Sequence, residues 1–322
     1  MSAPSALEKR ADYSLRRVAE FRDRVAAAVP ELESCENLCI YTTGSFGRRE
    51  AGEHSDLDLF FVQDGEIEAI GGRKETLIKA DLIRLCRTLG YPEFSGEGAY
   101  LKIHTVNDLA TRIGHPHEDA ENLFTARMLL FLESTPLHND SAYDRAISAC
   151  AEQYFRDFSD HSTNFRPLFL TNDIMRFWKT LCLNYENART SATQADKPKH
   201  RLKNFKLKFS RMMTCYSMLA CLCDPDESNT PEKLKVLVKM TPSERIWHIT
   251  GKHDLGDLYG SLVYEYEWFL TETDREKSSL LAWMTENKET ALRRASTFGN
   301  LIFRLLQVVA EKTHGDLRYM VV

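Results

Sequence analysis

The β-forming segments of this sequence are confined to one short region, and this confinement restricts the possible folds more than any other feature. Short β-prone runs occur at 37–43, 57–62 and 99–105. From about residue 119 almost to the C-terminus, apolar residues instead recur every three or four positions, which is typical of one face of an α-helix. The sequence therefore predicts an α+β fold, in which a small mixed-sheet module is joined to a larger C-terminal all-helical domain.

The same periodicity places the individual helices. An N-terminal helix is expected over 6–29, where Pro30 ends it, and another over 74–89. Further helices are expected over 121–132, 143–158, 168–187, 202–223, 231–237, 255–271 and 286–311. The polar stretch 189–199 is the best candidate for a mobile loop.

The length of 322 residues favours about two domains. Pro, His, Asn and Asp cluster between expected helices at 135–140, and we expect a domain boundary there. This divides the chain into an N-terminal helix (1–34), a mixed α/β module (35–137) and a helical domain (138–322).

Composition and charge exclude several classes of protein. The 43% of hydrophobic and 28% of charged residues are ordinary for a globular protein and argue against disorder. The sequence has no run of eighteen apolar residues for a membrane span, and no apolar segment of a secretory signal near its start. We therefore expect a cytoplasmic protein without a membrane partner, whose eight cysteines are reduced thiols. Cys35 and Cys39 alone have near-ligand spacing, but no second pair accompanies them, so buried small hydrophobes are favoured over a zinc site.

One motif indicates chemistry. A β-prone run ends at Gly44-Ser45, and about ten residues later Asp56 and Asp58 alternate with leucines at the start of the second run. Residues two apart on an extended strand share a face, with Cα atoms roughly 6.5–7 Å apart. Two carboxylates so placed repel each other unless a cation lies between them, and a hard divalent ion suits oxygen ligands. A glycine followed by a serine lets backbone N–H groups and a hydroxyl approach an anion, so the motif favours metal-assisted phosphoryl or nucleotidyl transfer.

The sequence around this motif resembles a known family. The segments 44–50 (GSFGRRE) and 55–59 (SDLDL) are similar to the nucleotidyltransferase fold of the DNA polymerase β superfamily. Within it, they are closest to the N-terminal module of the PII uridylyltransferases and related signal-transduction nucleotidyltransferases. The segments 103–109 and 123–130 resemble two further stretches of that subgroup. The motif-level likeness covers 38–133, and the helical remainder resembles the family's substrate-binding helical region more loosely.

The resemblance implies roles for these residues. Gly44 and Ser45 would hold the triphosphate, and Asp56 and Asp58 would coordinate two Mg²⁺ (or Mn²⁺) ions. Arg48 would contact phosphate. Glu50, which lies in the same loop, is expected to pair with Arg49 or another neighbour rather than act as a base.

The sequence departs from the family pattern at one point. The superfamily usually places a third carboxylate on a later strand, but the expected strand 99–105 contains no acid. Glu97 lies just before this strand and is the candidate for the third catalytic carboxylate. His104 is a second candidate near the site, as a proton acceptor, although a structural histidine is the favoured interpretation.

A basic segment in the helical half is the other candidate for ligand binding. Residues 197–211 contain seven Lys and Arg residues. They form either a solvated helix face or a basic wall that binds the β,γ-phosphates or an RNA backbone. Other enzymes of the superfamily use a Lys and a Ser on a C-terminal helix in this way, so Lys206, Lys208 and Ser210 are included as candidate nucleotide-binding residues.

The sequence thus predicts a Mg²⁺-dependent enzyme that transfers NMP from an NTP to an acceptor hydroxyl and releases pyrophosphate. The acceptor would be a protein, an RNA end or a small molecule. Two alternatives stay open: an oligonucleotide second-messenger synthase, and a non-catalytic nucleotide-binding regulatory protein that retains the fold without turnover.

Overall fold

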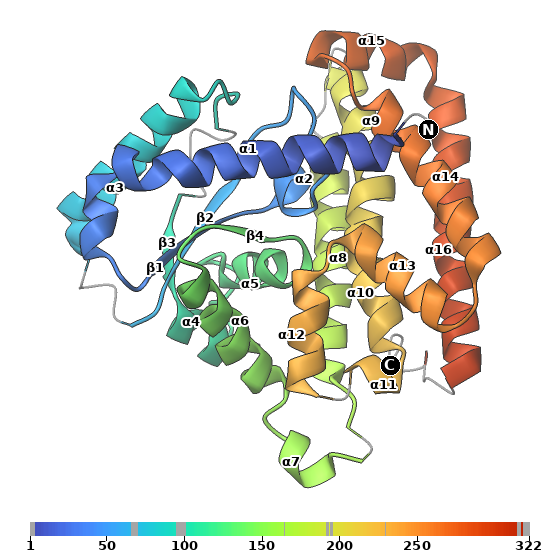
Figure 1. Cartoon of the computed structure of the whole chain (residues 1–322). Coiled ribbons are helices and arrows are strands. Elements are labelled where there is room, and N and C mark those ends of the chain that lie inside the picture. The colour runs from blue at the N-terminus through green and yellow to red at the C-terminus, as the bar shows by residue number, and fades with distance from the viewer. Residues whose placement is uncertain are drawn as a thin grey trace. The chain divides into compact units, whose positions relative to one another are not determined.

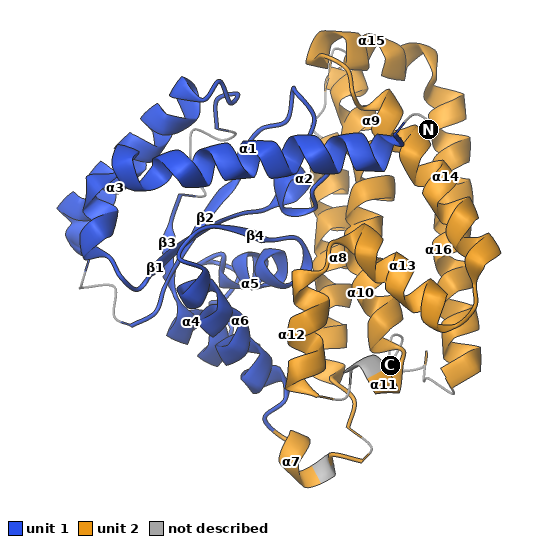
Figure 2. Ribbon diagram, viewed as in Figure 1, with its two compact units in different colours: residues 1–156 blue, residues 157–322 orange. Residues whose placement is uncertain are grey.

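The protein is described by a computed structural model, which covers residues 4–65, 70–94, 101–163, 165–190, 193, 196–228, 230–313 and 317. Helices form most of the described chain, and a four-stranded mixed sheet lies in its N-terminal half (Figure 1). This arrangement confirms the predicted α+β class. The chain separates into two compact units, Met1–Arg156 and Asp157–Val322 (Figure 2).

The sheet of the first unit has the strand order β3-β2-β1-β4. Its strands are β1 (Leu38–Thr42), β2 (Leu59–Gln63), β3 (Ile103–Thr105) and β4 (Thr135–His138). Both β2 and β4 run antiparallel to β1, whereas β3 runs parallel to β2. The three strands expected from the sequence are therefore present, although the second begins two residues later than expected.

Helices cover both faces of this sheet, so every residue of β1 and β2 is buried (Figure 1). On one face, strand side chains share a core with α1 (Ala6–Ala28) and α3 (Gly71–Thr88). The strand residues of this core are Leu38, Ile40, Leu59, Phe61, Ile103 and Leu137. The other face is covered by α4 (Val106–Thr111), α5 (Leu123–Leu132) and α6 (Asp140–Tyr154). The 3₁₀ turn η1 (Pro30–Ser34) links α1 to β1, and the short helix α2 (Gly44–Gly47) follows β1.

The first unit is larger than the mixed module expected from the sequence. The N-terminal helix is part of its core, because Phe21 and Val25 of α1 are buried against the sheet. The segment expected to be a boundary instead contains β4, in which Leu137 is buried. Proline is tolerated at position 136 because β4 is an edge strand. The chain therefore divides after Arg156 rather than near residue 137.

The described part of the second unit is helical throughout. Its helices are α7 (Phe158–His161), α8 (Leu168–Thr190), α9 (Lys197–Lys206), α10 (Met212–Leu222), α11 (Pro225–Ser228), α12 (Pro231–Lys239), α13 (Pro242–Lys252), α14 (Gly256–Glu272), α15 (Lys277–Glu286) and α16 (Lys288–Thr313). An aromatic cluster lies between α9, α10, α14 and α16, where the Phe209 ring stacks on Phe269 and Phe298 with centroids 4.9 Å apart in each pair. A π-helical turn, η5 (Leu207–Arg211), joins α9 to α10 where the sequence predicted one continuous helix.

The expected loop at 189–199 is wrong at both ends. Helix α8 continues to Thr190, and α9 begins at Lys197. All eight cysteines are free thiols and seven are buried, including Cys35 and Cys39, as the hydrophobe interpretation predicted. No helix in the described ranges combines the length and apolar character needed to cross a membrane.

Candidate functional site

The candidate site of the first unit is built where β1 ends. Thr43 is extended, and Gly44 turns the chain into α2 with a φ of +65°, a left-handed value that a residue with a side chain adopts only at a cost. The Thr43 N–H donates to the carbonyl oxygen of Asp58 at 3.1 Å. This hydrogen bond extends the pairing of the two strands by one step and brings the Gly-Ser turn beside the Asp-x-Asp segment.

Gly44 and Asp58 are in close proximity. A Cβ atom at residue 44 would lie 3.0 Å from Oδ2 of Asp58, tighter than nearly all real Cβ contacts. The backbone conformation favours glycine at this position, and a residue with a Cβ would in addition require the Asp58 carboxylate to shift. The Cβ atom of any other residue at position 44 would occupy the space next to the Asp58 carboxylate.

The two aspartates precede β2 rather than lie within it, because the strand begins at Leu59. Their alternation is nevertheless as predicted. Leu57 and Leu59 are both only 2% exposed, whereas Asp56 is exposed and Asp58 is half-buried. The leucines anchor the segment in the core and leave both carboxylates on the opposite side.

The donor set at this site suits a divalent cation. Two carboxylates one residue apart supply hard oxygen ligands, and Gly44 leaves room beside the more buried one. Within the described ranges, no group of three or more His, Cys, Asp or Glu side chains is placed to hold a metal ion. The described residues 101–105 of the third strand region contain no acid, and Glu97, the predicted third carboxylate, lies outside the described residues.

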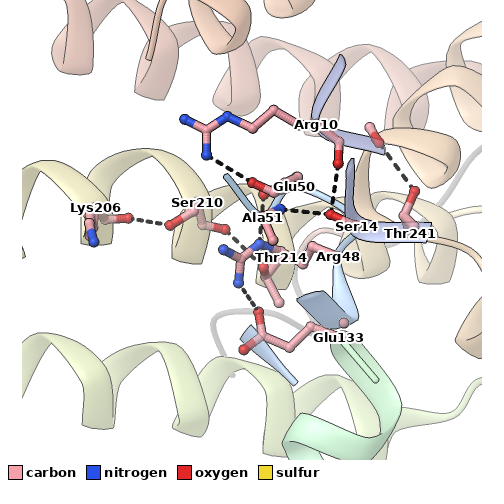
Figure 3. Close-up of polar contacts among 12 residues, drawn as sticks. Arg10, Ser14, Arg48, Glu50, Ala51, Glu133, Lys206, Ser210, Thr214 and Thr241 are labelled. Atoms are coloured by element: carbon pink, nitrogen blue, oxygen red, sulfur yellow. Dashed lines mark hydrogen bonds and ion pairs between the residues drawn. The ribbon is translucent and has the colours of Figure 1, made fainter. Parts of the chain in front are cut away.

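Arg48 has a different environment from the one expected. Its guanidinium is buried and bonds two carboxylates, Glu50 Oε2 at 2.8 Å and Glu133 Oε2 at 2.5 Å (Figure 3). These contacts make Arg48 part of an ion cluster inside the first unit. Glu50 does pair with a neighbour, Arg48, as expected.

This buried cluster fixes the loop that follows the Gly-Ser turn. Arg10 of α1 donates to the Glu50 carbonyl at 3.1 Å, and the Ala51 N–H donates to Ser14 Oγ at 2.9 Å (Figure 3). Gly47 packs so closely that a Cβ there would lie 1.9 Å from the carbonyl oxygen of Glu133. The contributions of α1 and Glu133 were not predicted, because they join residues far apart in the sequence. The only local signal was the buried face of the N-terminal helix.

His104 is a structural histidine. The side chain is 4% exposed, and burial, helped by nearby Lys102, lowers its pKa to about 4. The ring is therefore neutral near pH 7, and a base this weak is poorly matched to proton abstraction. The favoured interpretation of the sequence agrees with this environment.

The three candidate residues of the basic segment belong to the second unit. Ser210 is buried, and its hydroxyl donates to the Lys206 carbonyl at 2.9 Å (Figure 3). Lys206 is exposed at the end of α9, whereas Lys208 is half-buried and lines a cavity within this unit. Lys208 therefore differs from Lys206 and Ser210 in that it lines this cavity.

Comparison of the sequence with protein-family models gives no match. A search of curated proteins likewise finds no significant match. The geometry around Gly44 and Asp58 is thus the basis for proposing a function.

Proposed function

We propose that the protein is a divalent-metal-dependent nucleotidyltransferase, which moves NMP from an NTP to an acceptor hydroxyl. The observation that supports this most directly is the close approach of Gly44 to the Asp58 carboxylate. A turn without a side chain, beside a half-buried acid on the neighbouring segment, provides an anion-accessible backbone and a cation ligand in one place.

In this proposal Asp56 and Asp58 hold Mg²⁺ or Mn²⁺. When bound, the metal neutralises phosphate charge and lowers the pKa of an attacking hydroxyl. The Gly44 turn admits the triphosphate close to the backbone, and the half-buried Ser45 hydroxyl donates to a phosphate oxygen. The buried Arg48 cluster positions the loop rather than contacting the nucleotide.

The reaction would be an in-line displacement. The acceptor oxygen forms a bond to the α-phosphorus, the bond from that phosphorus to the bridging oxygen breaks, and pyrophosphate leaves. The acceptor hydroxyl releases its proton to solvent water in this step. Glu97 remains the predicted third carboxylate, with no structural observation that bears on it.

The test is incubation of the full chain with each α-³²P-labelled NTP, with Mg²⁺ or Mn²⁺, and with or without cell lysate. Label should move to a protein, RNA or small-molecule acceptor, and Asp56→Asn and Asp58→Asn should each reduce the transfer by at least about a hundredfold. Glu53→Gln changes an exposed acid in the same loop and is the matched control. Undiminished transfer in both aspartate variants would refute the assignment.

A second candidate function is nucleotide binding without turnover. The observation that favours it is the lack of an acid on β3 and on residues 101–102 before it. Metal-dependent NTP binding, abolished by Asp58→Asn and accompanied by no transfer with any nucleotide, would support this regulatory role. Label in a new small nucleotide without lysate would indicate a second-messenger synthase.

A further inference from the structure

The helical unit contains a cavity of its own, separate from the residues of the candidate site. It encloses about 400 Å³ between the end of α8, α9, η5, α15 and the start of α16. Cavities of roughly 300–1,000 Å³ are typical of small-molecule sites. All of its lining residues belong to the second unit, so its form does not depend on the first.

The charge of this cavity is one-sided. Among the described residues that line it, five are Lys or Arg and none is Asp or Glu. They are Arg189, Lys197, Arg201, Lys208 and Lys288. Only Arg189 is paired, with Glu186 at 2.8 Å, while the other four form no ion pair with any described residue. Four uncompensated cations around one cavity repel one another, in a chain whose net charge is −5.

The arrangement of α9 explains how these groups converge. Lys197, His200 or Arg201, and Asn204 follow one another at three- to four-residue intervals, so they lie on one face of the helix. The π-helical turn then places Lys208 on the same cavity. Lys288 comes from the first turn of α16, and Arg189 from the last turn of α8.

A second observation points to a ligand. The Nδ1 atom of His200 is buried and has no hydrogen-bond partner among the described residues. A buried polar atom without a partner is costly and is rare in folded proteins. The residue that carries this atom, His200, is itself part of the cavity lining.

Part of the cavity wall is apolar. Phe205 is 3% exposed and packs in the aromatic cluster, with its ring centroid 5.1 Å from that of Phe269. Met284 and Ala295 are also buried, whereas Leu292 at the rim is 41% exposed. The cavity therefore offers an apolar surface beside its cationic groups.

We propose that this cavity binds a small phosphorylated molecule that carries at least two negative charges and a planar or apolar ring. The cations neutralise the phosphate, and the apolar wall covers the ring. An RNA strand would need an extended groove that follows its backbone, whereas these cations gather around one cavity of about 400 Å³. The proposal does not rest on nucleotidyl transfer at the aspartates.

The test is calorimetric titration of the full chain with ADP and with inorganic pyrophosphate, in EDTA. Chelation removes the metal that the aspartate site would need, and the Asp56→Asn/Asp58→Asn variant should bind both probes as wild type does. Failure of nucleotidyl transfer would therefore leave this result unaffected, and the converse also holds.

Lys208→Gln and Lys288→Gln should each weaken the binding of both probes about tenfold, because each substitution removes a charge-assisted contact. Lys203→Gln is the matched control, since Lys203 is an exposed lysine of α9 outside the cavity lining. Leu292→Ser should weaken the binding of ADP and leave the binding of pyrophosphate unchanged.

Three outcomes would overturn the proposal: no binding of either probe, equal binding by the lysine variants and wild type, or binding of a single-stranded RNA 12-mer without binding of ADP. Equal affinity for ADP and pyrophosphate would overturn the claim that the apolar wall of the cavity binds a ring of the ligand.

Discussion

Asp58 Oδ2 lies 3.0 Å from the point where residue 44 would carry a Cβ atom, so any other residue at position 44 would crowd the carboxylate. Gly44 also has a left-handed backbone conformation. This relationship connects the end of β1 to the segment before β2, and the proposed metal site depends on it.

The effect of Gly44→Ala should therefore go beyond the free energy of unfolding that is lost because alanine is strained in the left-handed backbone conformation. We expect a loss of about 1–2 kcal/mol from the left-handed φ, together with displacement of the Asp58 carboxylate and loss of metal-dependent nucleotide binding. Gly90→Ala is the matched control, because Gly90 has a φ of +72° but no atom within 4 Å of a Cβ there. Urea denaturation and metal-dependent NTP titration measure the two effects. Equal behaviour of both variants in nucleotide binding would show that the carboxylate contact is unimportant.

Arg48→Met should be strongly destabilising. The side chains of Glu50 and Glu133 are 1% and 0% exposed, and the substitution removes a guanidinium that both buried carboxylates contact. We expect the free energy of unfolding to fall by about 3–5 kcal/mol. Arg22→Met breaks the pair of Arg22 with Asp140, whose side chains are 38% and 58% exposed, and should cost less than about 1 kcal/mol. Similar losses in chemical denaturation of both variants would contradict a structural role for the buried cluster.

Tyr41→Phe should be neutral or stabilising by up to about 1 kcal/mol. The Tyr41 hydroxyl is buried without a hydrogen-bond partner in the described part of the chain, and burial raises its pKa. Tyr143→Phe is the comparison, because the Tyr143 hydroxyl lies 2.7 Å from Ser134 Oγ, and its removal should cost about 1 kcal/mol. Thermal and urea unfolding of the two variants should rank them in this order. The reverse order would show that Tyr41 has a partner after all.

His104 should contribute to loss of stability in acid. Burial lowers its pKa from 6.5 to about 4, and Lys102 acts in the same direction against the weaker opposing effects of Asp108 and Glu121. Between these two pH values the unfolded chain binds a proton at His104 that the folded protein does not, so stability decreases as the pH falls through this window. A shift of this size corresponds to roughly 3 kcal/mol. His104→Gln should remove that part of the slope of unfolding free energy against pH, and an unchanged slope would disprove the role.

The sequence by itself determined the local features of this protein. Short β-prone runs predicted the strands around Leu38 and Leu59, and alternation in the second run placed the leucines at 57 and 59 inside and the two aspartates outside. Helical periodicity predicted α1, α8, α12 and α16 to within a few residues. These features depend on residues that lie within one or two helical turns or strand steps of each other. Such residues are close in the sequence, so their pattern can be recognised from the sequence alone.

Tertiary structure decided which distant groups meet. Arg48 looked like a phosphate ligand in its loop, but Glu133 arrives from the end of α5, 85 residues later, and makes the arginine a buried structural group. The segment 135–138 lies where the sequence predicted a domain boundary. In the structure it is an edge strand, which pairs with the side of β1 that β2 does not occupy. The lysines of the helical cavity likewise converge from separate helices. Contacts of this kind follow from packing a whole core, and no local pattern of residues specifies them.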